Sequence, residues 1–210
     1  MPKGGLLSVV LAAALLAVWP VAAPAQPSGP SPAAEALDEL PMRLGPFRRF
    51  TPVFDLEARP GGAGLGAAVG FTHDGGERAR GTVFLYDRGR ADLTDGHDNP
   101  DVMEELRFAT AEILSGAQSG RFQAAEWEAG MVWLADVPGR GMRCVTFRVV
   151  DRGGAPAGLG ACVAVQRGQF VKVELTSWGT PEAAAAGVLA GQLLGEVMGA
   201  RMPEDAPKPG

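Results

Sequence analysis

The feature that most constrains the fold is a run of three strand patterns in the last third of the chain. RCVTFRVVD begins at Arg143, LGACVAVQ at Leu159 and FVKVELTSW at Phe170. Each is rich in the residue types that favour β-strands. A Gly-Gly-Ala-Pro turn region joins the first two, and a tight Arg-Gly-Gln link joins the last two. Connections this short join antiparallel neighbours, so the sequence predicts an antiparallel sheet.

Alternation along these strands assigns their side chains to two faces of the predicted sheet. We expect one face to carry Val145, Phe147, Val149, Val163, Val165, Val171, Val173 and Leu175. We expect the other face to carry Cys144, Thr146, Arg148, Cys162, Ala164, Lys172, Glu174 and Thr176.

Cys144 and Cys162 are the two cysteines of the chain. A hairpin centred near Gly153 sets them opposite each other on one face, where cross-strand distances suit a disulfide. An even cysteine count in an exported protein also favours a bridge. We therefore predict a Cys144–Cys162 disulfide, with two buried free thiols as the alternative. A catalytic cysteine is not expected, because neither stretch places a histidine beside the thiol.

Two helices and a further hairpin complete the predicted domain. GLGAAVGFT and RGTVFLYD flank an Asp-Gly turn, which is typical of a hairpin. Asn99 and Pro100 are suited to the start of a helix over about 99–115, and Thr180 and Pro181 to one over about 181–199. The sequence thus predicts an α+β fold, an α/β sandwich in which two main helices flank an antiparallel sheet.

The chain ends predict export. Residues 1–25 have a short positive region, an apolar region and an Ala-Pro-Ala cleavage site, which together indicate a Sec-type signal peptide cut after Ala25. An uncut membrane anchor is the alternative. We expect a flexible Pro-rich tether over 26–43, a single domain over 44–201 and a disordered tail over 202–210. The predicted location is periplasmic or secreted.

The stretch LTDGHDNPDVMEE surrounds His97 with acidic residues. A metal site or a hydrolase using His97 with Asp95 or Asp98 is one interpretation. The acids, however, suit the first turns of the helix that starts at Asn99, and zinc-ligand or calcium-loop spacing is absent from the sequence. We therefore predict a solvated loop, with no metal, no cofactor and no catalytic residue.

The remaining candidate site is the predicted polar face that carries Arg148, Lys172 and Glu174. We expect a non-enzymatic protein that uses these residues to bind a protein or small-molecule partner in the envelope; a salt-bridge cluster beneath a covering helix is the alternative. The net charge of −5 gives no footprint for nucleic acid.

The last predicted helix repeats glycine at 187, 191, 195 and 199. This pattern is found in membrane glycine zippers and in helices that lie very close to a sheet. Glu182, Gln192 and Glu196 favour the second interpretation, so we expect no stable membrane span in the mature chain. An envelope-associated structural protein, retained through this helix or an uncut N-terminus, is a further alternative.

GLGAAVGF, GTVFLYDRG with the following Asp95-Gly96, and FVKVELTSW resemble a group of secreted proteobacterial proteins of unknown function. The layout also resembles the PsbP/Mog1-type α/β sandwich, which implies an antiparallel sheet between helices but no particular activity. The chain departs from the pattern at Glu174-Leu175, where a second basic residue is expected after the lysine.

Overall fold

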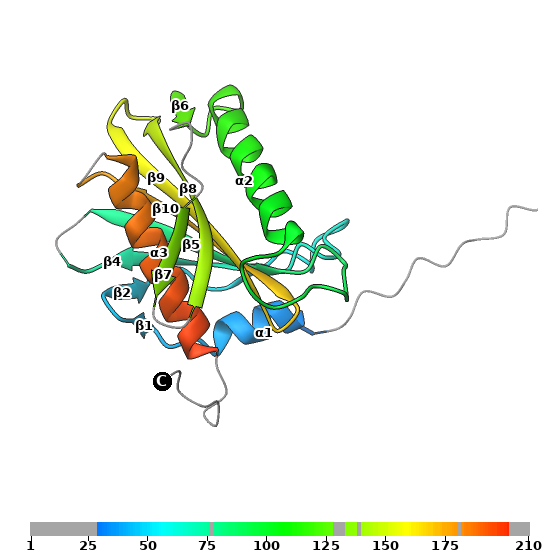
Figure 1. The fold of residues 1–210 in the computed structure, drawn as a ribbon. Helices are drawn as coiled ribbons and strands as arrows, with labels where there is room; N and C mark the ends of the chain where they lie inside the picture. Colours follow the sequence, from blue (N-terminus) through cyan, green and yellow to red (C-terminus); the bar gives the residue numbers. More distant parts are fainter. Residues whose placement is uncertain (1–28, 76–77, 128–132, 138–139, 180–181, 202–210) are drawn as a thin grey trace, which may run out of the picture.

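Figure 1 shows a computed structural model of the chain, which describes residues 29–75, 78–127, 133–137, 140–179 and 182–201. These residues form a mixed α+β fold with a ten-stranded sheet. The helices are α1 (Pro32–Asp38), α2 (Pro100–Gln118) and α3 (Ala183–Ala200). The strands are β1 (Arg43–Leu44), β2 (Phe47–Arg49), β3 (Phe54–Asp55), β4 (Ala67–His73), β5 (Ala79–Tyr86), β6 (Ala124–Trp127), β7 (Trp133–Val137), β8 (Arg140–Val150), β9 (Pro156–Gln166) and β10 (Gln169–Ser177).

The strands pair antiparallel in the order β1-β2-β4-β5-β10-β9-β8-β6. β3 also pairs with β4, and β7 with β8. β10 therefore lies near the middle, bonded to β5 on one side and β9 on the other. The predicted antiparallel sheet and its two hairpins, β4–β5 and β8–β9, are confirmed.

The disulfide predicted within the β8–β9 hairpin is present. Cys144 pairs directly with Cys162, their Cα atoms are 4.1 Å apart, and their sulfur atoms are bonded. Both residues are fully buried on the face of the sheet that α3 covers. A disulfide is compatible with an oxidising compartment outside the cytosol.

The predicted faces are wrong for β10. The β9–β10 turn consists of Arg167 and Gly168 alone, both with positive φ, so Gln166 pairs with Gln169. A two-residue turn with this geometry matches the twist of a hairpin. It pairs each odd-numbered residue of β10 with an even-numbered residue of β9, and the side chains of β10 thus exchange faces relative to the prediction.

α2 and α3 pack against opposite faces of the sheet. Val102, Leu106, Ala109 and Ile113 of α2 recur every three or four residues, and all four are buried. Asn99 caps the helix as predicted, and its Oδ1 atom accepts a hydrogen bond of 2.9 Å from the backbone N–H of Val102.

α3 lies very close to β9, as the glycine pattern suggested. Gly187, Gly191 and Gly195 are buried, and a β-carbon added to Gly160 of β9 would lie 2.7 Å from the Cα atom of Gly187. The helix begins at Ala183 after Glu182; Thr180 and Pro181, where we placed the cap, lie outside the described residues. By length and composition α3 is the one described helix that could cross a membrane, and more than half of it is buried within the protein.

Part of the segment expected to be a tether is structured. Ser31 caps α1, and Leu37 of that helix is fully buried against the sheet. The buried guanidinium of Arg49 donates hydrogen bonds to the carbonyl oxygens of Leu37 and Leu40, at 2.8 and 2.6 Å. The proline-rich composition suggested flexibility, but Ser31-Pro32 is also a common start of a helix, and burial of Leu37 stabilises it.

Candidate functional site

Polar side chains occupy the centre of the sheet face that lies beneath α2. Lys172 and Glu174 of β10 pair directly with Phe84 and Thr82 of β5, and Tyr86 follows two positions after Phe84. Directly paired residues on antiparallel strands share a face, so these five side chains lie together. The side chains of Lys172 and Glu174 are only 7% and 6% exposed.

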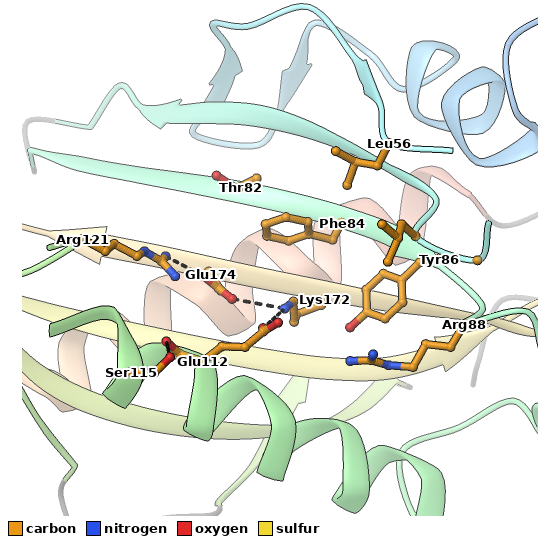
Figure 2. Close-up of a pocket in the computed structure, with 12 residues that line it drawn as sticks. Leu56, Thr82, Phe84, Tyr86, Arg88, Glu112, Ser115, Arg121, Lys172 and Glu174 are labelled. Atoms are coloured by element: carbon orange, nitrogen blue, oxygen red, sulfur yellow. Dashed lines mark hydrogen bonds and ion pairs between the residues drawn. The ribbon is translucent and has the colours of Figure 1, made fainter. Parts of the chain in front are cut away.

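These five residues form the floor of a cavity of about 460 Å³ between α2 and the sheet (Figure 2). A volume of this size is typical of small-molecule sites. The walls come from α2 and the segment that follows it, from the segment that follows β5, and from the segment between β3 and β4. They consist of Glu112, Ser115, Arg121, Arg88, Leu56, Gly64 and Leu65.

Two glycines hold the segment between β3 and β4 against the end of β5. Gly64 and Gly66 have φ angles of +76° and +63°, which residues with a β-carbon rarely adopt. A β-carbon on Gly66 would also collide with the carbonyl oxygen of Leu85. This close approach places Leu65 at the cavity with 49% of its surface exposed.

A chain of ion pairs runs across the cavity floor. The Nζ atom of Lys172 lies 3.2 Å from Oε1 of Glu174 and 3.3 Å from Oε2 of Glu112. The second oxygen of Glu174 accepts a hydrogen bond of 2.6 Å from Nη2 of Arg121. Figure 2 shows this chain extending from Arg121 through Glu174 and Lys172 to Glu112. Both carboxylate oxygens of Glu174 are therefore engaged.

Both members of the buried pair stay ionised at neutral pH. Burial alone would raise the pKa of Glu174, but the positive charges of Lys172 and Arg121 and their hydrogen bonds lower it below its ordinary value. Burial alone would lower the pKa of Lys172, but Glu174 and Glu112 raise it. The cavity therefore has a charged floor across the neutral range.

Two aromatic rings lie beside the Lys172 ammonium group. Its Nζ atom lies 4.8 Å from the centre of the Phe84 ring and 5.8 Å from that of Tyr86, within the range of cation–π attraction. The cavity thus offers aromatic surface directly beside charge.

A second network fixes the other end of the floor. The Tyr86 hydroxyl donates a hydrogen bond of 2.6 Å to Oε1 of Glu105, and Arg88 binds both oxygens of that carboxylate. The Glu105 side chain is only 1% exposed. Arg88 has a φ of 57°, unusual for a residue other than glycine, and such backbone conformations are common at functional sites.

The structure brings together two of the three predicted site residues. Lys172 and Glu174 are neighbours on the α2 face, whereas Arg148 alternates with Phe147 and Val149 and so lies on the α3 face. There it is exposed, beside Glu182, which precedes α3. The predicted grouping with Arg148 is therefore wrong, because the two-residue turn reversed the faces of β10.

Sequence reasoning missed the partners that α2 supplies. Glu105 and Glu112 are seven residues apart, and this spacing places both on one side of a helix. Glu105 falls three residues after the buried Val102, so the helical spacing places it on the side of α2 that faces the sheet. We had interpreted it instead as a carboxylate that interacts with the helix dipole. Arg121 offered no such signal, because it follows the helix in an irregular segment.

The two histidines lie on different parts of the sheet. The ring of His73 contacts Phe47 of β2, and the ring of His97 lies against Gly141 of β8. Between β2 and β8 the sheet contains β4, β5, β10 and β9. Within the described residues, no three His, Cys, Asp or Glu side chains form a group suited to a metal ion.

Comparison with family models, curated proteins and solved structures found no match to the chain.

Proposed function

We propose that this is a non-enzymatic exported protein that reversibly binds a small amphipathic molecule in the cavity beneath α2. The observation that carries the proposal is the Lys172–Glu174 ion pair, which is buried at the centre of the sheet and faces an open cavity instead of packed side chains. Ionisable groups with shifted pKa values that line a cavity are common at functional sites.

The energetics of the ion pair support a binding role over a purely structural one. Removing two charges from water costs several kcal/mol each, and apolar residues at such positions are often neutral or stabilising. Phe84 and Tyr86 could pack with apolar neighbours at both positions, yet the chain carries a lysine and a glutamate there. A ligand that contacts both the charged and the aromatic surface gives this arrangement a function.

Export and the layered architecture belong to the same proposal. The signal-peptide pattern of residues 1–25 and the disulfide support a periplasmic or secreted location. The sheet between α2 and α3 supports an α/β sandwich of the PsbP/Mog1 type, and the resemblance to secreted proteobacterial proteins of unknown function agrees with both. A cavity of this volume is more consistent with a small ligand than with a protein partner.

Thermal unfolding with three dodecyl amphiphiles below their micellar concentrations tests the proposal: dodecanoate, dodecyl trimethylammonium and dodecyl maltoside. A ligand that binds only the folded state at about 100 times its Kd stabilises it by about 2.7 kcal/mol. For a domain of this size, we expect at least one of them to raise Tm by about 5 °C or more.

Two matched substitutions locate the binding. Leu65, at the cavity, and Val188, on the solvent side of α3, are 49% and 59% exposed. We expect Leu65→Ser to reduce the shift in Tm and Val188→Ser to leave it unchanged. The proposal is wrong if none of the amphiphiles shifts Tm, or if the two substitutions have equal effects.

A further inference from the structure

We infer that the ligand is an acidic amphiphile, a small molecule with a carboxylate or similar anionic group at one end and a hydrocarbon or aromatic body. This inference rests on the proposed function and adds the sign of the ligand's charge and its direction in the cavity.

The cavity is polarised along its length. Figure 2 shows Arg121, Thr82 and Ser115 toward one end, and Leu56, Tyr86 and Arg88 toward the other. Arg88 already binds both oxygens of the Glu105 carboxylate, whereas the guanidinium of Arg121 makes one hydrogen bond among the described residues, to Glu174. Leu65 adds apolar surface to the lining. An elongated molecule with one polar and one apolar end therefore fits in one direction, with its polar group beside Arg121.

Hydrogen-bonding capacity near Arg121 favours an anion. Only Nη2 of Arg121 has a hydrogen-bond partner in the described part of the chain, and 44% of the side chain is exposed. Its remaining N–H groups are available to a carboxylate, which a guanidinium group can bind through two parallel hydrogen bonds. The hydroxyl group of Thr82 can act as a further donor at this end, whereas that of Ser115 already donates to the carbonyl oxygen of Glu112.

The acidic side chains offer less to a cationic ligand. Both oxygens of Glu174 are already bound, one by Lys172 and the other by Arg121. Glu105 is engaged by Tyr86 and Arg88 and does not line the cavity. Oε1 of Glu112 has no hydrogen-bond partner among the described residues, but Lys172 lies beside Oε2. An ammonium group would meet Lys172 and Arg121 in the same space.

A pair of fluorescent probes that differ only in charge tests the inference. Anilinonaphthalene sulfonate carries an anionic group on an aromatic body, and N-phenyl-naphthylamine has the same rings without the sulfonate. We expect wild-type protein to bind both in fluorescence titrations, and to bind the sulfonate at least about tenfold more tightly, a difference of about 1.4 kcal/mol. This comparison needs no substitution.

Two variants assign the preference to Arg121. Arg121→Lys keeps the charge but loses the planar fork, and Arg121→Gln removes the charge while Glu174 stays paired with Lys172. We expect Arg121→Gln to reduce the preference for the sulfonate to less than about threefold and Arg121→Lys to retain part of it. Circular dichroism confirms that each variant is folded. Should Arg121→Gln not fold, the wild-type preference and its decrease with added salt decide the question.

The outcomes separate this inference from the proposed function. If both probes bind saturably with equal affinity and Leu65→Ser weakens both, the cavity binds amphiphiles but the acidic class is wrong. If neither probe binds, the proposed function itself fails. If Leu114→Ser weakens binding and Leu65→Ser does not, the probes occupy the apolar groove that Leu114 forms with Met103 and Trp127, and the inference is also wrong.

Discussion

Tyr86 is the single tyrosine of the chain, so its ionisation can be followed without interference from another phenol. Burial raises its pKa, and the Glu105 carboxylate that accepts its hydrogen bond raises it further, to well above the ordinary value. Arg88 acts in the opposite direction. The single tyrosine thus reports on the network that fixes one end of the cavity.

We predict that Glu105→Gln lowers the pKa of Tyr86, because the substitution removes the negative charge and leaves the positive charge of Arg88. Ultraviolet absorbance of tyrosinate in a pH titration measures the change. Asp101→Asn is the control, since Asp101 lies on the same helix and pairs with Arg90 instead. An equal tyrosinate midpoint in wild type and Glu105→Gln would contradict the network.

The ring of His97 packs against Gly141, a role that the acidic residues around it in the sequence did not suggest. A β-carbon on Gly141 would collide with the His97 ring. We predict that Gly141→Ala destabilises the protein by about 1–3 kcal/mol, as overpacking does, and that His97→Ala in the same chain restores most of this loss. Urea unfolding of the two single variants and the double variant measures the coupling. Additive effects would show that the ring does not occupy this space.

At the scale of single elements, Arg49 holds α1 to the sheet. Its guanidinium donates to the carbonyl oxygens of Leu37 and Leu40 at the end of that helix and is 7% exposed. We predict that Arg49→Met destabilises the protein by about 2–4 kcal/mol, because it leaves buried carbonyl groups without partners.

The neighbouring Arg48 provides a matched control for that prediction. Its side chain is 52% exposed and forms a surface pair with Asp74, so Arg48→Met is expected to cost less than about 1 kcal/mol. Denaturant midpoints of the two variants give the comparison. Equal midpoints would mean that Arg49 contributes no more than a surface charge.

Elements with a local signal were predictable from the sequence, whereas pairings that depend on one turn residue were not. Asn99 and Pro100 identified the start of α2, and the positions of Cys144 and Cys162 in a hairpin identified the disulfide. The β9–β10 turn has two residues where we expected three. This difference of one residue in the length of the turn decides which face of β10 carries Lys172 and Glu174. The alternation of residues within the strand does not reveal the length of the turn.

At the scale of the whole molecule, the sequence predicted the α+β class but not the cavity. Its lining comes from β5, β10, α2 and the segment between β3 and β4, which are distant in the chain. Lys172 and Glu174 were recognisable as unusual, because they interrupt an apolar strand. Their partners Glu112 and Arg121 come into reach only when α2 packs on the sheet, and that position depends on tertiary contacts.

The pH dependence of stability follows from the directions of the two pKa shifts. The pKa of Glu174 is lowered on folding, so its contribution is complete above the unfolded value of about 4.3 and is lost as pH falls through the folded value. The pKa of Lys172 is raised, so its contribution is complete below about 10.4 and is lost as pH rises through the folded value. Between these limits, the pair adds no pH dependence.

Replacing both charges at once separates a binding role from a structural one. We predict that Lys172→Met and Glu174→Leu together leave the free energy of unfolding at pH 7 within about 1 kcal/mol of wild type or raise it. Each single substitution is expected to cost about 3–5 kcal/mol, because the remaining buried charge loses its buried partner. Arg121 and Glu112, the remaining partners, are 44% and 58% exposed and can be hydrated.

The same double variant should bind the amphipathic probes more weakly and lose less stability than wild type as the pH falls below about 4.3, because it has no Glu174 to protonate. Urea unfolding at several pH values and probe titrations on one preparation measure both effects. If the double variant is instead as unstable as the sum of the single variants, the ion pair is needed for folding. The charged residues on the cavity floor would then serve folding, and they would no longer indicate a bound ligand.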